Sequence, residues 1–157
     1  MWLHPVGRRT GRAALAVGLA MAVLSAGGCH SAAPPAQVER WADAWIMALN
    51  SHQLAYFDPL FGPPGTYEDP VTKEPVSGAR LGFYLSGQWR RFPKLRYEQG
   101  RVTGDRNTVV VEWLATGFTD DPQAKPVPGV FVLALQGEAI TSVRAYFDSC
   151  AVLPTAR

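Results

Sequence analysis

Two adjacent carboxylates, Glu68 and Asp69, stand directly before Pro70 and are the side chains in this sequence most able to move a proton. Side chains alternate along an extended segment, so Tyr67 and Asp69 would share one face while Glu68 points the other way. A carboxylate held among aromatic residues loses hydration and becomes a stronger base. Asp69 is therefore the candidate general base. The sequence leaves equally open that it is a solvated acid capping a turn at Pro70.

Other residue patterns that carry chemistry are missing from the sequence. There is no glycine-rich phosphate loop, no Cys/His spacing of a metal site and no nucleophile elbow. His52 follows an expected helix in a polar turn, without a second histidine nearby, which is typical of a surface residue rather than a metal ligand. We therefore expect no metal and no cofactor.

The N-terminal segment, residues 1–28, has the composition of a signal peptide. It holds Arg8, Arg9 and Arg12, no acidic residue and a charge-free apolar run over residues 13–24, which is too short to span a bilayer comfortably. The small residues before Cys29 resemble the lipobox of bacterial lipoproteins. This resemblance implies cleavage before Cys29 and a lipid on that cysteine, and an ordinary cleaved secretory peptide is the alternative.

These features divide the chain into a signal peptide (1–28), a lipidated Cys29 with a linker to residue 36, one domain (37–150) and a tail (151–157). We expect an exported protein, anchored by its lipid to the cell membrane or outer membrane, with the domain on the periplasmic or extracellular side. If Cys29 is acylated, Cys150 has no partner within the chain; if it is not, a Cys29–Cys150 disulfide is conceivable.

The charge of the chain lies mostly in the leader. Without its three arginines, the 15 basic residues fall to 12, against 13 acidic ones. A body this close to neutral has no basic patch of the kind that binds nucleic acid, so we expect no nucleic-acid partner. With 47% hydrophobic residues, the chain can build one compact domain with a core.

The hydrophobic periodicity changes near Pro93, from helical to alternating. Helices are predicted over residues 37–50, 54–61 and 79–92. Strands are predicted over residues 95–102, 108–118, 127–135 and 140–147. Helices followed by consecutive antiparallel strands predict an α+β fold in which three N-terminal helices pack on a curved, mostly antiparallel sheet. Such a sheet wrapped around a helix forms a cone whose mouth can hold a small apolar molecule.

This order of elements, with the Glu68-Asp69-Pro70 segment between the helices, resembles the NTF2-like superfamily, and within it the SnoaL-like and ketosteroid-isomerase-like domains. The resemblance covers residues 38–148. The local motifs that carry it are Ala48-Leu49-Asn50, Glu68-Asp69-Pro70-Val71, Glu74-Pro75, Ser77-Gly78 and Arg144-Ala145.

The resemblance implies that Asp69 is the base that moves a proton between carbons of a bound molecule. It places Trp45 where the isomerase has a tyrosine and Phe131 where it has a protonated acid. An enolate needs hydrogen-bond donors, and Phe131 has none, so the pocket is kept while the isomerase machinery is lost or replaced. The expected pocket residues are aromatic side chains that could equally be plain core, namely Trp45, Tyr67, Trp113, Phe131 and Phe147.

Asp148 is a weaker catalytic candidate, because an acid in the last strand is catalytic in some SnoaL-like relatives. Alternation puts Val143, Ala145 and Phe147 on one face, which the resemblance assigns to the pocket, and Asp148 on the other face with Arg144. Asp148 is then a strand-end acid near Arg144, unless a bulge reverses the assignment.

The expected site residues and the family resemblance indicate three candidate functions. The first is binding of a small hydrophobic molecule in the cone, without assured catalysis. The second is an isomerase, cyclase or lyase with Asp69 as general base. The third is a protein-interaction module of the cell envelope, since sheets of this superfamily form homodimers. Beyond the ligand, the expected partners are a membrane, through the lipid on Cys29, and a second copy of the chain.

Overall fold

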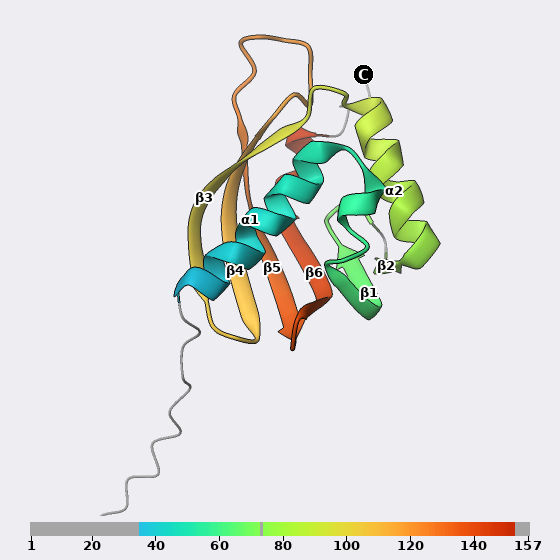
Figure 1. Cartoon of the computed structure of the whole chain (residues 1–157). Helices are drawn as coiled ribbons and strands as arrows, with labels where there is room; N and C mark the ends of the chain where they lie inside the picture. Colours follow the sequence, from blue (N-terminus) through green and yellow to red (C-terminus); the bar gives the residue numbers. More distant parts are fainter. Residues whose placement is uncertain (1–34, 73, 153–157) are drawn as a thin grey trace, which may run out of the picture. The chain divides into compact units, whose positions relative to one another are not determined.

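The computed structural model describes residues 35–72 and 74–152, and Figure 1 shows how their elements are arranged. Two α-helices and one sheet make up most of this part of the chain. The helices are α1 (Pro35–Ser51) and α2 (Gly78–Arg91), and the strands are β1 (Phe61–Glu68), β2 (Val76–Ser77), β3 (Arg96–Gly104), β4 (Thr108–Thr116), β5 (Val127–Gln136) and β6 (Ala139–Phe147). Short 3₁₀ turns lie at Leu54–Tyr56 (η1) and Ser149–Ala151 (η2).

The sheet is mixed and curved. Its strand order is β2-β1-β6-β5-β4-β3, and every pair is antiparallel except β1 with β6. The register shifts between Gln99 and Val102 in β3 and between Ala134 and Leu135 in β5. Such irregularities bend strands and increase their twist, which lets the sheet wrap around the helices. The expectation of a mostly antiparallel, curved sheet is confirmed.

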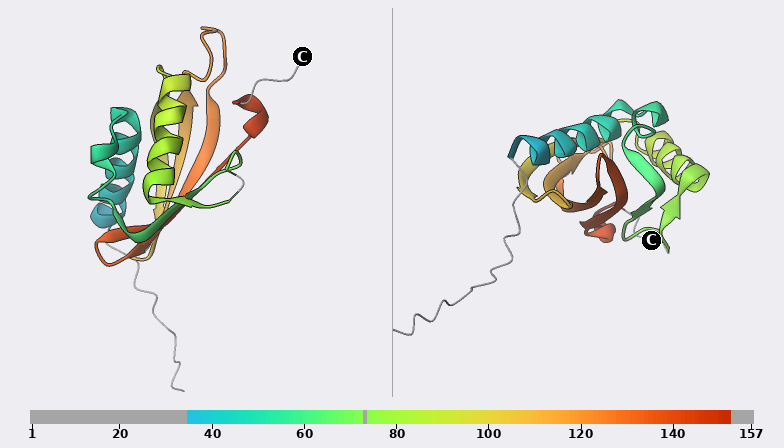
Figure 2. Two further views of the ribbon diagram at one scale, coloured as in Figure 1. Left: turned by 90° about the vertical axis from the view of Figure 1, so that its right-hand side faces the viewer. Right: turned by 60° about the horizontal axis from the view of Figure 1, so that its bottom comes forward.

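Both helices lie on the same face of this sheet (Figure 2). The apolar stripe of α1 packs on β3 and β4, while α2 packs on β1 and β2 at the other edge. In α2 the fully packed positions are Leu81, Leu85 and Trp89, one helical turn apart. The predicted helices over residues 37–50 and 79–92 are therefore confirmed.

The predicted second helix, over residues 54–61, is wrong. The structure has only the turn Leu54–Tyr56 there, and β1 begins at Phe61, so the described residues contain two helices rather than three. Pro59 explains the difference, because proline removes an amide donor and disfavours helical geometry at the residue before it. The Gly-Pro-Pro-Gly stretch at residues 62–65 falls inside β1, where pairing with β6 is interrupted between Phe61 and Thr66.

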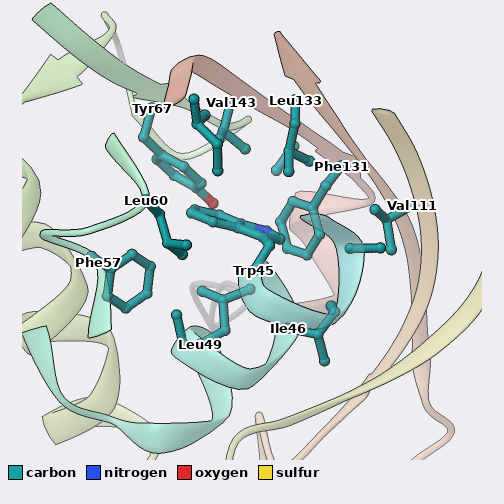
Figure 3. Packing of buried hydrophobic residues seen from close by; sticks show 14 of the residues in the cluster. Trp45, Ile46, Leu49, Phe57, Leu60, Tyr67, Val111, Phe131, Leu133 and Val143 are labelled. Atoms are coloured by element: carbon teal, nitrogen blue, oxygen red, sulfur yellow. The ribbon is translucent and has the colours of Figure 1, made fainter. Parts of the chain in front are cut away.

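Trp45 occupies the centre of the core and has no exposed surface. Its ring lies edge-on to Phe57 and Phe131 and is stacked near Tyr67, as Figure 3 shows. This packing places Tyr67 and Phe131 between Trp45 of α1 and the cavity that is described below.

The predicted signal peptide, Cys29 and the linker lie outside the described residues, apart from the linker's last positions, where α1 has already begun. Among the helices that are described, none combines the length and the apolar character needed to cross a membrane.

Candidate functional site

A cavity of about 350 Å³ lies between α2 and the sheet. Aromatic rings from five strands and from α2 form most of its wall. The described residues that line it are Tyr67, Val71, Phe83, Tyr84, Gly87, Gln88, Arg91, Phe92, Tyr97, Trp113, Phe118, Phe131, Phe147 and Val152. Its volume and apolar lining match those of small-molecule sites, which span about 300–1,000 Å³ and carry few polar groups.

Four of the five aromatic residues predicted for the pocket line this cavity: Tyr67, Trp113, Phe131 and Phe147. Trp45 is placed one layer deeper, in the core behind Tyr67, because its position on α1 faces the middle of the sheet. The alternation predicted for β6 is also observed. Val143 and Ala145 are buried on the cavity side, whereas Tyr146 is 53% exposed on the other.

Asp69 is the one buried charged side chain among the described residues, with 4% of its surface exposed. One carboxylate oxygen, Oδ1, accepts hydrogen bonds from the backbone amides of Val71 (2.8 Å) and Thr72 (2.9 Å). The other, Oδ2, accepts from the hydroxyls of Tyr67 (3.0 Å) and Tyr84. The carboxylate thus caps the turn expected at Pro70 from a buried position beside the cavity, so it is not the solvated acid of the alternative interpretation.

Tyr84 joins Asp69 to the cavity and was not predicted from the sequence. It comes from α2, and its hydroxyl also accepts a hydrogen bond from Gln88 Nε2 (2.8 Å). Tyr84 and Gln88 are four residues apart and border the buried stripe of α2. That helical spacing next to a buried stripe is the signal that could have identified both residues. We call the four residues Tyr67, Asp69, Tyr84 and Gln88 the polar wall.

The two phenols of the polar wall remain protonated at neutral pH. Burial, and then the Asp69 carboxylate, raise the pKa of Tyr67 well above its ordinary value. Burial and the hydrogen bond to Asp69 raise the pKa of Tyr84 in the same direction. Burial also raises the pKa of Tyr97 on the opposite wall, with a smaller contribution from Asp69. All three tyrosines therefore line the cavity as neutral side chains.

Asp69 itself is not among the residues that line the cavity. A bound molecule would meet the hydroxyls of Tyr67 and Tyr84 first, with the carboxylate directly behind them. If Asp69 acts as a base, as the sequence suggests, the proton has to pass through one of these hydroxyls.

The other acids singled out in the sequence lie away from the cavity. Glu68 points to the opposite face, as expected, and approaches Arg144 at 3.5 Å. Asp148 is exposed and caps the turn after β6, where its carboxylate accepts from the amide of Cys150 (2.9 Å). Arg144 thus contacts Glu68 rather than Asp148, and Asp148 has a local structural contact that explains its position.

His52 and Cys150 also find ordinary surroundings. His52 adopts a positive φ of 54° at the end of α1, stacks on Trp89 and lies 3.0 Å from the carbonyl of Leu95. No group of three or more metal-binding side chains is found within residues 35–72 and 74–152. Cys150 is exposed, so it is not a buried core residue.

The mouth of the cavity combines an apolar and a cationic side chain from α2. Phe83 is 76% exposed, and the guanidinium of Arg91 lies 5.1 Å from the centre of the Phe92 ring. Arg91 makes no ion pair with any described residue. The positive charge is therefore at the entrance, while the buried carboxylate lies behind Tyr67 and Tyr84.

A second cavity, of about 650 Å³, lies on the other side of α2. Of its described lining residues, only Asp58 and Ser77 have polar side chains, and Asp58 is exposed. Glycine, proline and aliphatic residues, including Gly82 of α2, form the rest together with the rings of Phe57 and Phe61. This cavity is larger than the first but brings no buried polar group towards its interior.

Comparison with known proteins identifies the same fold. A family model described as SnoaL-like domain matches residues 38–143. No curated protein matches the chain.

Three solved structures can be superimposed on most of the domain. A candidate SnoaL-like polyketide cyclase from Jannaschia sp. CCS1 is 20% identical, with a TM-score of 0.63 over 74% of this chain and 89% of that one. A SnoaL-like protein of unknown function from Burkholderia thailandensis is 16% identical, with a TM-score of 0.62 over 74% and 98%. A candidate ketosteroid isomerase from Kribbella flavida is 20% identical, with a TM-score of 0.58 over 78% and 81%. At these identities the likeness shows the NTF2-like fold alone.

Proposed function

The chain belongs to the SnoaL-like domain family, and on that premise we propose that its domain binds a small, mostly apolar molecule in the cavity between α2 and the sheet. The observation that supports this function best is the polar wall. A charged group is costly to bury, and Asp69 is kept buried beside a space of about 350 Å³ rather than in solvent. An otherwise aromatic cavity with a few convergent polar groups is the usual form of a ligand site.

Two leucine substitutions on α2 test this proposal. Gly87 lines the cavity, and a Cβ there would meet nothing within 4 Å, so we expect the side chain of Gly87→Leu to extend into the cavity. Gly82 lines the second cavity, where a Cβ would meet only the exposed side chain of Leu54 at 3.3 Å. Both changes replace a helical glycine, so both should be tolerated by the fold.

Native mass spectrometry of the full-length protein provides the readout. We expect extra mass from a retained small molecule in the wild type and in Gly82→Leu, and its loss in Gly87→Leu. Extra mass that survives Gly87→Leu would place the ligand elsewhere. An empty protein that occurs only as a homodimer would favour an interaction module instead.

Proton-transfer catalysis is a second candidate function, favoured by the position of Asp69 one hydroxyl away from the cavity. In such a step a substrate C–H bond breaks, the proton goes to the Tyr67 oxygen and the Tyr67 proton goes to Asp69, which leaves a carbanion and a neutral acid. The enolisable ketone β-tetralone can be followed by NMR in deuterated water. Protein-dependent exchange that is lost in Asp69→Asn would support this function, and exchange unchanged in that variant would remove Asp69 from it.

Export and lipid anchoring through Cys29 complete the proposal. They are supported by the sequence of residues 1–29 alone. Cys29→Ser should move the protein from the membrane fraction to the soluble fraction of its cell. A wild-type protein that is already soluble would contradict the anchor.

A further inference from the structure

The polar wall has no phenol proton to offer a ligand. A tyrosine hydroxyl carries one proton. The protons of Tyr67 and Tyr84 are both directed at Oδ2 of Asp69. Their oxygens keep lone pairs, so towards the cavity these two hydroxyls act as acceptors.

Asp69 is held in the orientation that fixes this arrangement. Its Oδ1 is occupied by the amides of Val71 and Thr72, so Oδ2 is the atom that faces the two tyrosines. One N–H of Gln88 is also used, on the Tyr84 hydroxyl. What remains of Gln88 is one N–H and the carbonyl oxygen Oε1, so the wall as a whole has more free acceptors than donors.

The negative charge of Asp69 also favours a ligand that donates a hydrogen bond. Asp69 forms no ion pair with any described residue, so its negative charge acts through the hydroxyls on whatever lies in the cavity. A ligand carbonyl oxygen placed against Tyr67 would meet lone pairs backed by a carboxylate. A ligand hydroxyl in the same place would donate a hydrogen bond that the carboxylate strengthens.

We propose that the polar wall selects ligands that present a hydroxyl group on an apolar ring system over ligands that present only a carbonyl or an ether oxygen. This inference rests on the proposed function and names the ligand class of that cavity. It is the opposite of an oxyanion hole, which would offer donors. An ammonium group is disfavoured relative to a hydroxyl, because the guanidinium of Arg91 lines the same cavity.

Three naphthalene derivatives that share one ring system and differ in their oxygen-bearing group test the selection by isothermal titration calorimetry on the full-length protein. They are β-naphthol, its methyl ether and methyl naphthyl ketone. One hydrogen bond to an acceptor of this kind corresponds to about tenfold in affinity, so β-naphthol should bind about tenfold more tightly than the other two. Equal affinity for all three probes would be consistent with binding in the cavity and would overturn the proposed preference for a hydroxyl group. No binding of any probe would contradict the proposed function, and the inference would fall with it.

Asp69→Asn provides the sharper test, because it is isosteric and reverses the direction of the hydrogen bonds. The asparagine oxygen can keep the amides of Val71 and Thr72, which leaves its two N–H groups to donate to the oxygens of Tyr67 and Tyr84. Both phenol protons are then free to turn towards the cavity. The preference for β-naphthol over the ketone should disappear or invert.

The matched control is Asp58→Asn, which makes the same change in the second cavity and should keep the wild-type preference. A preference unchanged in Asp69→Asn, in a variant that unfolds at the wild-type denaturant midpoint, would overturn the inference. A general loss of packing would weaken all three probes together and would not invert their order.

Discussion

Helix α2 separates two cavities that differ in volume and in chemistry. The larger, about 650 Å³, is lined mainly by glycine, proline and aliphatic side chains with the rings of Phe57 and Phe61, and its acid, Asp58, is exposed. The smaller, about 350 Å³, is lined by aromatic rings and has a buried carboxylate with four hydrogen bonds behind its wall. Volume alone therefore does not identify a ligand site. A buried charge that keeps its hydrogen bonds beside a cavity is more informative.

The largest expected difference between the two cavities is in stability. Asp69→Ala removes the acceptor of two backbone amides and two hydroxyls, and buried donors left unsatisfied cost about 1–3 kcal/mol each. The hydroxyls can turn into the cavity, so we expect a loss of about 3 kcal/mol in the free energy of unfolding. Asp58→Ala, at an exposed position, should change it by less than about 0.5 kcal/mol. Urea denaturation of both variants measures these changes in the free energy of unfolding. Equal changes would show that the two acids do not differ in their contribution to stability.

The next effect concerns the sheet side of the smaller cavity. Gly129 lies opposite Trp113 in the β4–β5 pair, and a Cβ there would overlap the Trp113 ring. Gly129→Ala should push this ring towards the cavity, lower the free energy of unfolding by about 1–3 kcal/mol and weaken ligand retention. Gly87→Ala, whose Cβ meets open space in the helix, should instead stabilise the protein by up to about 1 kcal/mol. Retention that survives Gly129→Ala undiminished would mean that Trp113 does not shape the site.

The smallest change in the free energy of unfolding, counted per tyrosine and per pH unit, is expected at alkaline pH. Burial raises the pKa of Tyr67 and of Tyr97, so between their unfolded and folded values these tyrosines ionise in the unfolded state only. Their contribution to stability is complete below about pH 10 and is lost as the pH rises further. Each should lower the free energy of unfolding by about 1.4 kcal/mol per pH unit in this range.

Tyr67→Phe should reduce that slope by the contribution of one tyrosine, measured by urea denaturation at several values above pH 10. The same substitution at exposed Tyr146 is the control for surface composition. A slope that is identical in the wild type and in Tyr67→Phe would show that Tyr67 is not shielded from solvent in the folded protein.

The fold was largely predictable because its signals are local. The helical stripe of α1 and the alternation of β4 to β6 are periodic over many residues, and the structure follows them. The error at residues 54–61 has a physical cause, since a short apolar run can belong to a helix or a turn, and Pro59 was the deciding residue. The parallel pairing of β1 with β6 depends on contacts between segments far apart in the chain, which no local pattern reveals.

The candidate site was predictable in part. Asp69 and Tyr67 are two residues apart, so strand alternation placed them on one face, and the hydrogen bond between them agrees. Tyr84 reaches the same carboxylate from α2 while Gln88 donates to the Tyr84 hydroxyl, and the angle between helix and sheet that permits this contact is a tertiary property. Trp45 had the right residue type for the pocket, but only the packing of α1 shows that Tyr67 covers it.

NMR titration of the isotopically labelled full-length protein with β-naphthol tests most directly whether the smaller cavity is the binding site. Gly87 and Gly82 lie on the same helix and line different cavities, and their backbone amides report on each in one spectrum. We expect the resonances of Gly87 and of the Trp113 indole to shift with increasing β-naphthol while that of Gly82 stays in place. A shift at Gly82 with Gly87 and Trp113 unmoved would contradict it, and would assign binding to the larger cavity.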